Sequence, residues 1–302
     1  MATPFSASSC GLSVVGEFEG THSEGVLPDA GDAAPGDGAT LPGDGSVPPD
    51  EPPPDQPPPV DECPPGVVCD VIASTTVLDV AVNASALYWL DSNGAIGIAA
   101  KDGSGARTLV SGERGSLAGL EADEQYVYWT ASGKLRRASA RDGSGASTLA
   151  DVRGGCLRRG RTPTELLASA PEAGNIYVVQ TNNGERTTLV TQATNPWGVV
   201  VVEPNDVFYT NYDSESGRIR KGRPGGGVTS VFLDGQRGPR CMATDGVSLW
   251  WANRDSGTLM KSPVSTANAQ AFVTNQRRIN GVALDATYVY WSYEAGIRRR
   301  TK

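Results

Sequence analysis

The sequence has little of what several common protein classes require. It contains a single histidine, His22, and five cysteines among 302 residues. No apolar run approaches the roughly 18 residues that a membrane-spanning helix needs, which excludes a multi-span membrane protein. HExxH and CxxC motifs are absent, and no glycine-rich phosphate loop opens a helix after a strand. The 37 glycines and 21 prolines argue against a helical bundle.

Basic residues are missing from the first part of the chain. Residues 1–70 contain no lysine or arginine, but they hold 13 acidic residues and 14 of the 21 prolines. The rest of the chain, 71–302, carries 21 acidic and 26 basic side chains, so the overall net charge of -8 comes entirely from this arm. A modest net charge of +5 beside an acidic arm argues against a nucleic-acid partner.

Composition divides the chain into three parts. Residues 24–66 are mostly Gly, Asp, Pro, Ala and Ser, with PPDEPPPDQPPP at 48–59. Such a segment cannot fill a core, and its prolines and uncompensated carboxylates favour an extended chain. We therefore expect an N-terminal segment at 1–23, a disordered linker with polyproline II character at 24–66, and a folded domain at 67–302.

A short motif near the N-terminus bears on the compartment. Residues 1–23 lack the basic and apolar stretches of a signal peptide. However, Ala7-Ser8-Ser9-Cys10-Gly11 resembles the end of a bacterial lipoprotein signal, although that family usually has a large aliphatic residue where this sequence has Ala7. The resemblance implies lipidation of Cys10, a hydrophobic segment encoded upstream of Met1, and a place on the cell envelope or outside the cell. The alternative is an unmodified cysteine in a cytoplasmic protein.

The cysteine count fits this interpretation. If Cys10 is lipidated, an even number remains, namely Cys63, Cys69, Cys156 and Cys241. Cys63 and Cys69 enclose PPGVV, and a bridge across this loop would add about 2 kcal/mol of stability and imply an oxidising compartment. Pairing of Cys156 with Cys241 stays open. A zinc site needs four ligands, and the only histidine is in the arm, so no metal is expected.

Internal repetition dominates the chain beyond residue 70. DGSGARTL at 102–109 recurs as DGSGASTL at 142–149. Paired aromatic residues, and one leucine pair, recur with about the same period: Tyr88-Trp89, Tyr128-Trp129, Leu166-Leu167, Phe208-Tyr209, Trp250-Trp251 and Tyr290-Trp291. Because five of the six tryptophans belong to these pairs, the aromatic residues serve the repeat instead of gathering at one site.

Each repeat reads as four short strands. The last repeat predicts strands at 281–285, 288–292 and 296–300, and fourth strands of other repeats are expected at 108–110, 188–191 and 230–233. The DGSG segments supply the glycines with positive φ that a hairpin between third and fourth strands needs. A serine-hydrolase elbow joins a strand to a helix, so a GSG that repeats in hairpins indicates no catalytic serine.

Four short strands in a repeat of roughly 40 residues are typical of the blades of a β-propeller. At Tyr88-Trp89-Leu90-Asp91, the chain resembles the YWTD propellers of the LDL-receptor family and related six-bladed bacterial secreted proteins, over residues 71–302. Six anchors predict an all-β, six-bladed propeller with four-stranded blades. The fourth motif position is Asp only in the first blade, so the family's Asp-mediated ties between blades are not expected elsewhere. The third blade departs most from the repeat.

The two ends of the repeat region complement each other. The chain stops after a third strand, which leaves the last blade one strand short. Residues 70–74, which precede the first inner strand at 78–82, supply a matching strand. Pairing of these ends closes the ring and removes an exposed sheet edge. We expect a closed, monomeric propeller.

Basic residues recur in the loops that lead from a fourth strand to the next inner strand. These loops, at 112–115, 152–155, 194–197, 236–240 and 276–280, are expected to converge at one mouth of the central channel. The predicted ligand-binding residues are Arg114, Arg153, Trp197, Arg237, Arg240, Arg277, Arg278 and Asn280. Arginine and tryptophan are enriched at binding hot spots, and arginine suits carboxylates and phosphates. The alternative is a rim of ion pairs with acids such as Asp213, Glu215, Asp255 and Glu294.

These features predict a binding or scaffold propeller on the bacterial cell envelope. Its expected partner is a protein, or an anionic small molecule or glycan, and membrane contact is expected only through a lipid anchor. No catalytic residue or cofactor is predicted, because acid-base chemistry without histidine would depend on carboxylates or lysines. The alternative is a divalent-metal-dependent hydrolase similar to gluconolactonase-like propellers, with Asp79, Asn195 and Asn280 as candidate ligands.

Overall fold

The computed structural model describes residues 63–73, 77–225 and 229–302. These described residues belong to one compact unit. The predictions for Cys10, for segment 1–23 and for the linker before residue 63 concern residues outside this description. Within the described residues all regular structure is β-strand, and no helix there is long and apolar enough to cross a membrane.

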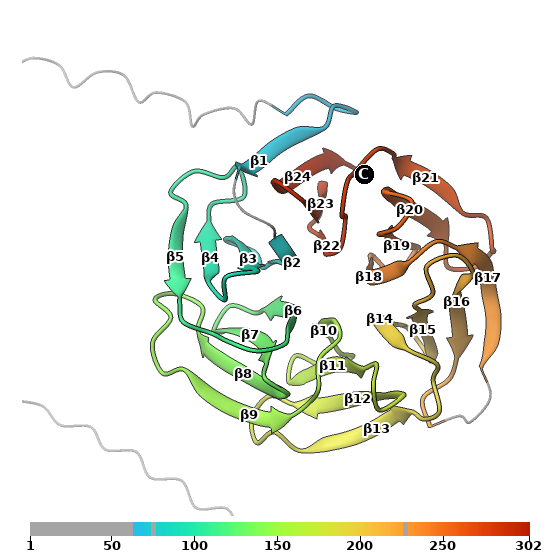
Figure 1. Ribbon diagram of the computed structural model, residues 1–302, viewed down its shortest axis with the longest axis horizontal. Helices are drawn as coiled ribbons and strands as arrows, with labels where there is room; N and C mark the ends of the chain where they lie inside the picture. The colour runs from blue at the N-terminus through green and yellow to red at the C-terminus, as the bar shows by residue number, and fades with distance from the viewer. Residues whose placement is uncertain (1–62, 74–76, 226–228) are drawn as a thin grey trace, which may run out of the picture. The chain divides into compact units, whose positions relative to one another are not determined.

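Six antiparallel sheets of four strands each surround a central channel (Figure 1). The strands of the first three blades are β2 (Val77–Val82), β3 (Leu87–Asp91), β4 (Ile96–Ala99), β5 (Arg107–Val110), β6 (Leu117–Ala122), β7 (Tyr126–Ala131), β8 (Lys134–Ser139), β9 (Ser147–Asp151), β10 (Leu157–Arg159), β11 (Glu165–Ala170), β12 (Asn175–Gln180) and β13 (Arg186–Val190). The other strands are β14 (Pro196–Val202), β15 (Asp206–Asn211), β16 (Gly217–Gly222), β17 (Ser230–Gln236), β18 (Pro239–Thr244), β19 (Ser248–Asn253), β20 (Thr258–Pro263), β21 (Gln270–Val273), β22 (Val282–Leu284), β23 (Tyr288–Tyr293), β24 (Gly296–Thr301) and β1 (Cys69–Ala73). The predicted six-bladed, all-β architecture is confirmed.

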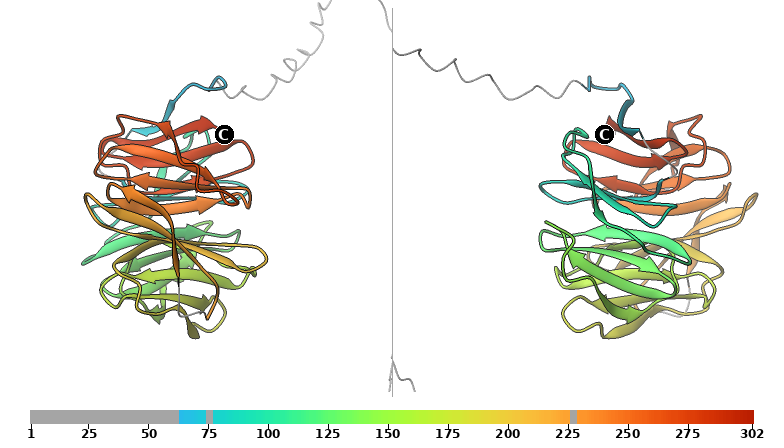
Figure 2. Two further views of the ribbon diagram at one scale, coloured as in Figure 1. Left: turned by 90° about the vertical axis from the view of Figure 1, so that its right-hand side faces the viewer. Right: turned by 60° about the vertical axis from the view of Figure 1, so that its left-hand side comes forward.

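The sixth blade is completed by the strand that comes first in the sequence. β1 pairs antiparallel with β24, with Cys69 opposite Arg299 and Ala73 opposite Gly296. Both views in Figure 2 show β1, in blue, beside the red C-terminal strands. The predicted closure of the ring is therefore confirmed. A disulfide between Cys63 and Cys69, with Cα atoms 5.9 Å apart, links the start of β1 to the segment before it.

The hydrophobic core consists of six clusters, and each cluster draws its residues from two neighbouring blades. The repeated aromatic residues fill them, and the largest fully buried side chains include Trp129, Trp250, Trp251 and Trp291. Removing a buried aromatic side chain typically costs about 3–5 kcal/mol. The two residues of a repeated pair face opposite blade interfaces, so that Tyr88 packs in the cluster shared with the second blade and Trp89 in the cluster shared with the sixth.

Polar contacts also tie neighbouring blades together. The indole N–H of Trp251 donates to Gln236 Oε1 over 3.1 Å, and that of Trp291 donates to Gln276 Oε1 over 3.0 Å. In the corresponding loop of the first blade, Glu113 forms an ion pair with Arg136 at 2.6 Å. Side chains located just before an inner strand therefore link neighbouring blades, at blades whose aromatic motif has no Asp in its fourth position.

One layer of residues lies in the inner strands or directly before them. It contains Asp79, Gly119, Cys156, Gly198, Cys241 and Gly281, one residue from each blade in turn. A Cβ on Gly119 would lie 2.5 Å from the Gly155 carbonyl oxygen, and one on Gly198 would lie 2.5 Å from that of Arg240. Because such contacts are too short, only glycine lets the neighbouring inner strands approach this closely.

Candidate functional site

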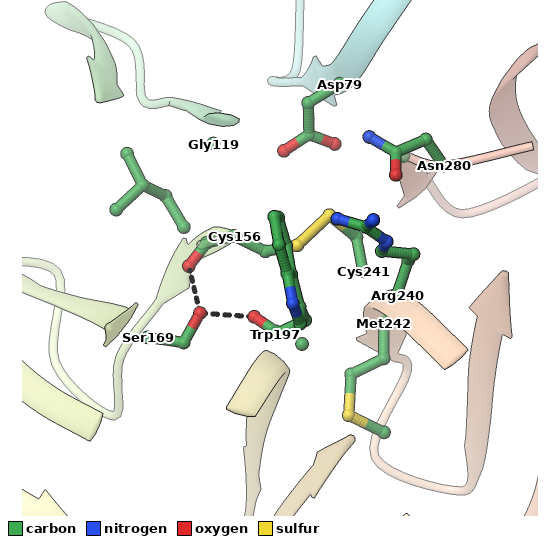
Figure 3. Close-up of a disulfide and its surroundings, with 12 residues drawn as sticks. Asp79, Gly119, Cys156, Ser169, Trp197, Arg240, Cys241, Met242 and Asn280 are labelled. Carbon is green, nitrogen blue, oxygen red and sulfur yellow. Dashed lines mark hydrogen bonds between the residues drawn. A yellow bond between two sulfur atoms is a disulfide. The ribbon is translucent and has the colours of Figure 1, made fainter. Parts of the chain in front are cut away.

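A disulfide crosses the channel in the layer described above. It joins Cys156, directly before β10, to Cys241 on β18, with Cα atoms 5.6 Å apart, and it bridges blades three and five past β14 (Figure 3). One Asp79 carboxylate oxygen and the two sulfur atoms all lie within 4.8 Å of one another. The cysteine pairing that the sequence left open is thus resolved, and the bond fills part of the channel.

Arg158 contacts the inner strands of three other blades. Its guanidinium donates to the carbonyl oxygens of Met242 and Val282, each over 2.7 Å, and it lies 3.4 Å from Asp79 Oδ2. Asp79 is fully buried, and it also accepts the backbone N–H groups of Val80 and Leu120. Burial raises the pKa of Asp79, whereas Arg158 and the two N–H groups oppose that rise. This layer separates the two channel mouths, whose hollows share no lining residue.

The mouth at the start of the inner strands is basic. A hollow of about 300 Å³ there is lined by the apolar starts of β2 and β6 and by Trp197, Arg240, Arg254, Arg278 and Asn280. No acidic residue among those described lines it. Of the residues predicted from sequence, the structure brings Trp197, Arg240, Arg278 and Asn280 together at this hollow, which we call the arginine mouth.

Arg240 is the most buried cation of the arginine mouth, at 9% exposure. Its guanidinium carbon lies 3.7 Å from the ring centroid of Trp197 and 4.3 Å from that of Tyr212. Its Nε has no hydrogen-bond partner among the described residues. Burial lowers the pKa of Arg240, and the nearby charge of Arg254 adds to this effect. The mouth therefore holds a stacked arginine with unused hydrogen-bonding capacity.

Two residues at this site were not predicted from the sequence: Arg254, which lines the arginine mouth, and Tyr212, which stacks on Arg240. Arg254 follows β19 and Tyr212 follows β15, so both lie in turns after second strands and not in the loops before inner strands. Within residues 63–73, 77–225 and 229–302, neither Arg254 nor Arg278 forms a side-chain hydrogen bond or ion pair. Tyr212 and Arg254 occupy equivalent positions in their repeats, because each directly follows the fourth residue of the aromatic motif, Asn211 or Asn253. This equivalence was the available sequence signal for the two residues.

The other predicted residues are placed differently. Arg153 lines a neighbouring hollow of about 510 Å³ that also contacts Trp197, and it lies 3.7 Å from Glu172 in an exposed ion pair. Arg277 pairs with Glu294 at 3.3 Å, as the mixed-charge alternative expected for such rims. Arg114 and Arg237 are exposed and line neither hollow.

The candidate metal ligands are engaged in other contacts. Of the three, Asp79 lies within an inner strand, whereas Asn195 and Asn280 lie just before the inner strands β14 and β22. Asn280 Nδ2 donates to the Leu78 carbonyl, and Asn195 Nδ2 donates to that of Tyr212 over 3.1 Å. The Asp79 carboxylate already accepts two backbone N–H groups beside Arg158. Each of the three residues therefore already makes structural contacts with neighbouring backbone groups.

The opposite mouth has a different chemistry. The ends of all six inner strands line a hollow of about 180 Å³ there. Its lining is mostly apolar, but it also includes Glu121 of β6 and Arg158 and Arg159 of β10. Glu121 is 7% exposed, and its Oε1 accepts the Ala122 N–H over 3.0 Å. Burial raises its pKa to about 7, although Arg158 opposes this. We call this hollow the Glu121 mouth.

The raised pKa of Glu121 makes stability depend on pH. The folded protein binds this proton more tightly than the unfolded chain, whose pKa is near 4.5, so stability present at low pH is lost as pH rises from about 4.5 to about 7. Glu121→Gln removes this pH-dependent loss of stability. We expect the unfolding free energy of the variant to be up to about 3 kcal/mol higher than that of the wild-type protein at pH 8, and equal to it at pH 4. Urea unfolding from pH 4 to 8 checks this, with Glu124→Gln as control. Parallel profiles of wild type and Glu121→Gln would contradict it.

Sequence comparison identifies no relatives: the chain matches no protein-family model and none of the curated proteins. Solved structures are similar in fold. They include the nidogen/laminin complex (TM-score 0.56, 15% identity, covering 72% of this chain and 83% of the other), PQQ-bound aldose sugar dehydrogenase from Streptomyces coelicolor (0.60, 14%, 78% and 98%) and virginiamycin B lyase from Staphylococcus aureus (0.54, 14%, 75% and 80%).

These neighbours have different activities. One is a dehydrogenase, one is a lyase, and one is a complex of nidogen with laminin, as their names state. At identities of 14–15% the likeness concerns the backbone alone, because a fold hosts many unrelated functions. The comparisons therefore identify this chain as a β-propeller, as its repeat predicted.

Proposed function

We propose that this protein is a non-enzymatic binding propeller, and that its arginine mouth holds an anionic group of a protein, glycan or small molecule. The carrying observation is the set of three arginines, Arg240, Arg254 and Arg278, around one hollow that none of the described acidic residues lines. Buried or clustered cations without counter-charges favour an anion that supplies them. Carboxylates and phosphates match the planar donors of arginine.

The shape of the arginine mouth supports the same function. Trp197 and Tyr212 stack on Arg240 and leave its Nε unpaired among the described residues, so its guanidinium is held in place before any ligand arrives. A preorganised donor loses less entropy on binding than a mobile surface side chain does. Exposed pairs such as Arg277 with Glu294 contribute little by comparison.

The residues at hand support binding better than catalysis. A histidine-to-alanine variant of the staphylococcal lyase is catalytically inactive, whereas the only histidine of this chain lies at position 22. The hydrolase alternative needs Asp79, Asn195 and Asn280 to share a divalent ion. The Asp79 oxygens and the two side-chain amides serve the structural contacts described above, and Arg158 lies beside Asp79.

Display on the bacterial cell envelope is part of this proposal. Two disulfides, one at the start of β1 and one across the channel, are typical of proteins in oxidising compartments. The lipoprotein-like sequence at Cys10 would anchor the chain, and the Pro-rich linker would act as a spacer. Mass spectrometry of the protein purified from its native host tests this, and an unmodified Cys10 with four free thiols would contradict it.

A binding experiment tests the arginine mouth. Trp197 should report ligand binding, because the other five tryptophans are buried. We expect citrate and inorganic phosphate to quench its fluorescence. The double variant Arg254→Gln, Arg278→Gln should weaken binding at least about tenfold, since it removes two cations from the hollow. Affinity should also fall several-fold as the salt concentration rises from about 0.05 to about 0.5 M.

The chain provides a matched control. Arg114→Gln, Arg237→Gln removes the same charge from neighbouring loops but touches neither hollow, so we expect less than about a twofold change in affinity. Trp197→Phe identifies the reporting tryptophan. Equal weakening by both double variants would mean that only net charge matters, and it would contradict a specific site.

A further inference from the structure

The Glu121 mouth is separate from the arginine mouth, because the layer with Asp79, Cys156 and Cys241 lies between them and the two hollows share no lining residue. Its hollow of about 180 Å³ is comparable to an engineered cavity of about 150 Å³ that holds benzene. Val80, Val200, Val282 and Leu284 provide apolar walls, Glu121 provides a carboxylate, and Arg158 and Arg159 also line the hollow. A short hydrocarbon chain with one polar end group therefore fits this space.

The Glu121 carboxylate forms no direct ion pair with a cation of the described residues. Its only hydrogen bond among the described residues is the one from the Ala122 N–H to Oε1, and no cation of the described residues lies within 4.0 Å of it. The two nearest arginines serve other acids, because Arg158 pairs with Asp79 and Arg159 pairs with Asp123 at 2.9 Å. A buried carboxylate without a partner favours a ligand that brings a positive charge.

The inner strands add suitable acceptors. Each is the edge of its sheet, so it presents backbone carbonyl groups to the channel. The carbonyls of Met242 and Val282 already accept hydrogen bonds from a cation, the Arg158 guanidinium. An ammonium group has three donors, which a carboxylate and such carbonyls can satisfy together.

We infer that the Glu121 mouth binds a small primary amine, with the ammonium group on the Glu121 carboxylate and its short apolar chain against the valines. The acceptor is one oxygen of Glu121, and the rest of the ligand replaces water on the apolar walls. Nothing in this inference depends on the arginine mouth, which prefers the opposite charge.

Binding should depend on pH through Glu121. The charged groups that face Glu121 are Asp79 on β2 and Arg158 and Arg159 on β10. Two tyrosines, Tyr88 on β3 and Tyr128 on β7, stay protonated because burial raises their pKa values. An alkylammonium group, with a pKa near the lysine value of about 10.4, stays charged up to pH 8. Since Glu121 ionises around pH 7, affinity should rise roughly 30-fold from pH 5.5 to pH 8.

The test uses the full chain and n-butylammonium as the probe, with n-butanol as the uncharged probe of similar size. Titrations followed by NMR at pH 5.5 and pH 8 should show the rise in affinity for the amine only. Glu121→Gln should weaken amine binding at pH 8 at least about tenfold and abolish its pH dependence, and the matched control Glu124→Gln should leave both unchanged. Equal affinity for butanol, or unchanged binding by Glu121→Gln, would overturn the inference.

A second measurement needs no variant. The side-chain carboxyl carbon of Glu121, observed by ¹³C NMR during a pH titration, should change its midpoint to a lower pH by at least one unit when n-butylammonium is saturating. Binding of the cation stabilises the ionised carboxylate, so this direction is required. A midpoint that does not move would contradict the inference even if Glu121→Gln fails to fold.

Discussion

Deleting residues 1–76 should lower the melting temperature by about 10 °C or more, whereas deleting residues 1–60 should leave it nearly unchanged. The longer deletion removes β1, the strand that completes the sixth blade on β24. It exposes the apolar surface that Ile72, at 6% exposure, shares with Trp89, Tyr290 and Ile297. Burial of one such side chain is worth about 1.5–3 kcal/mol, the lost strand pairing adds to this, and about 1 kcal/mol corresponds to about 2–4 °C in a domain of this size.

Thermal unfolding followed by circular dichroism checks this prediction. Adding the oxidised peptide 63–76 to the longer deletion should restore part of the lost melting temperature, because the peptide carries the whole of β1. An exposed ion pair such as that of Asp70 with Arg298, at 2.7 Å, contributes little to the difference. Equal melting temperatures of the two deletions would show that the ring does not need β1.

Replacing Arg158 with methionine should cost about 3–5 kcal/mol of unfolding free energy at pH 7. The substitution keeps an apolar stem but leaves the fully buried Asp79 without its cation, and removal of one partner of a buried pair typically costs this amount. It also leaves the carbonyls of Met242 and Val282 without their donors. Urea unfolding at pH 7 measures the loss.

Two further variants separate the charge from the packing. Asp79→Asn should cost less than Arg158→Met, because Arg158 keeps both carbonyl acceptors and Asn can still accept a backbone N–H. The double variant should cost less than the sum of the two single variants, since neither charge then remains unpaired. Strict additivity would show that Arg158 and Asp79 do not interact across the channel.

The fold was largely predictable because the blade is a local pattern. The strand expected at 296–300 is β24 (Gly296–Thr301), and the closing strand expected at 70–74 is β1 (Cys69–Ala73). Even in the third blade, the leucine pair at 166–167 lies in β11. A strand of alternating residues ended by a tight turn is recognisable in sequence, and repetition of the pattern counts the blades.

The candidate sites were less predictable. The loops before the inner strands drew attention to Arg240 and Arg278, but the equally basic Arg114 and Arg237 lie outside the hollow. Arg254, which lines the arginine mouth, and Tyr212, which stacks on Arg240, both come from the turns after second strands. Glu121 and Arg158 stood within strands, where sequence gives no sign that a charged side chain points into a channel.

Sequence by itself determined the number of blades, their four-stranded form and the closure of the ring, because these follow from alternation within strands and from the regular spacing of the repeats. Only the tertiary structure decided which side chains meet in the channel. Cys156 meets Cys241 and Arg158 meets Asp79 across separations of 85 and 79 residues. Such contacts arise when a closed ring points one layer of six inner strands at a common axis, and no local pattern records that geometry.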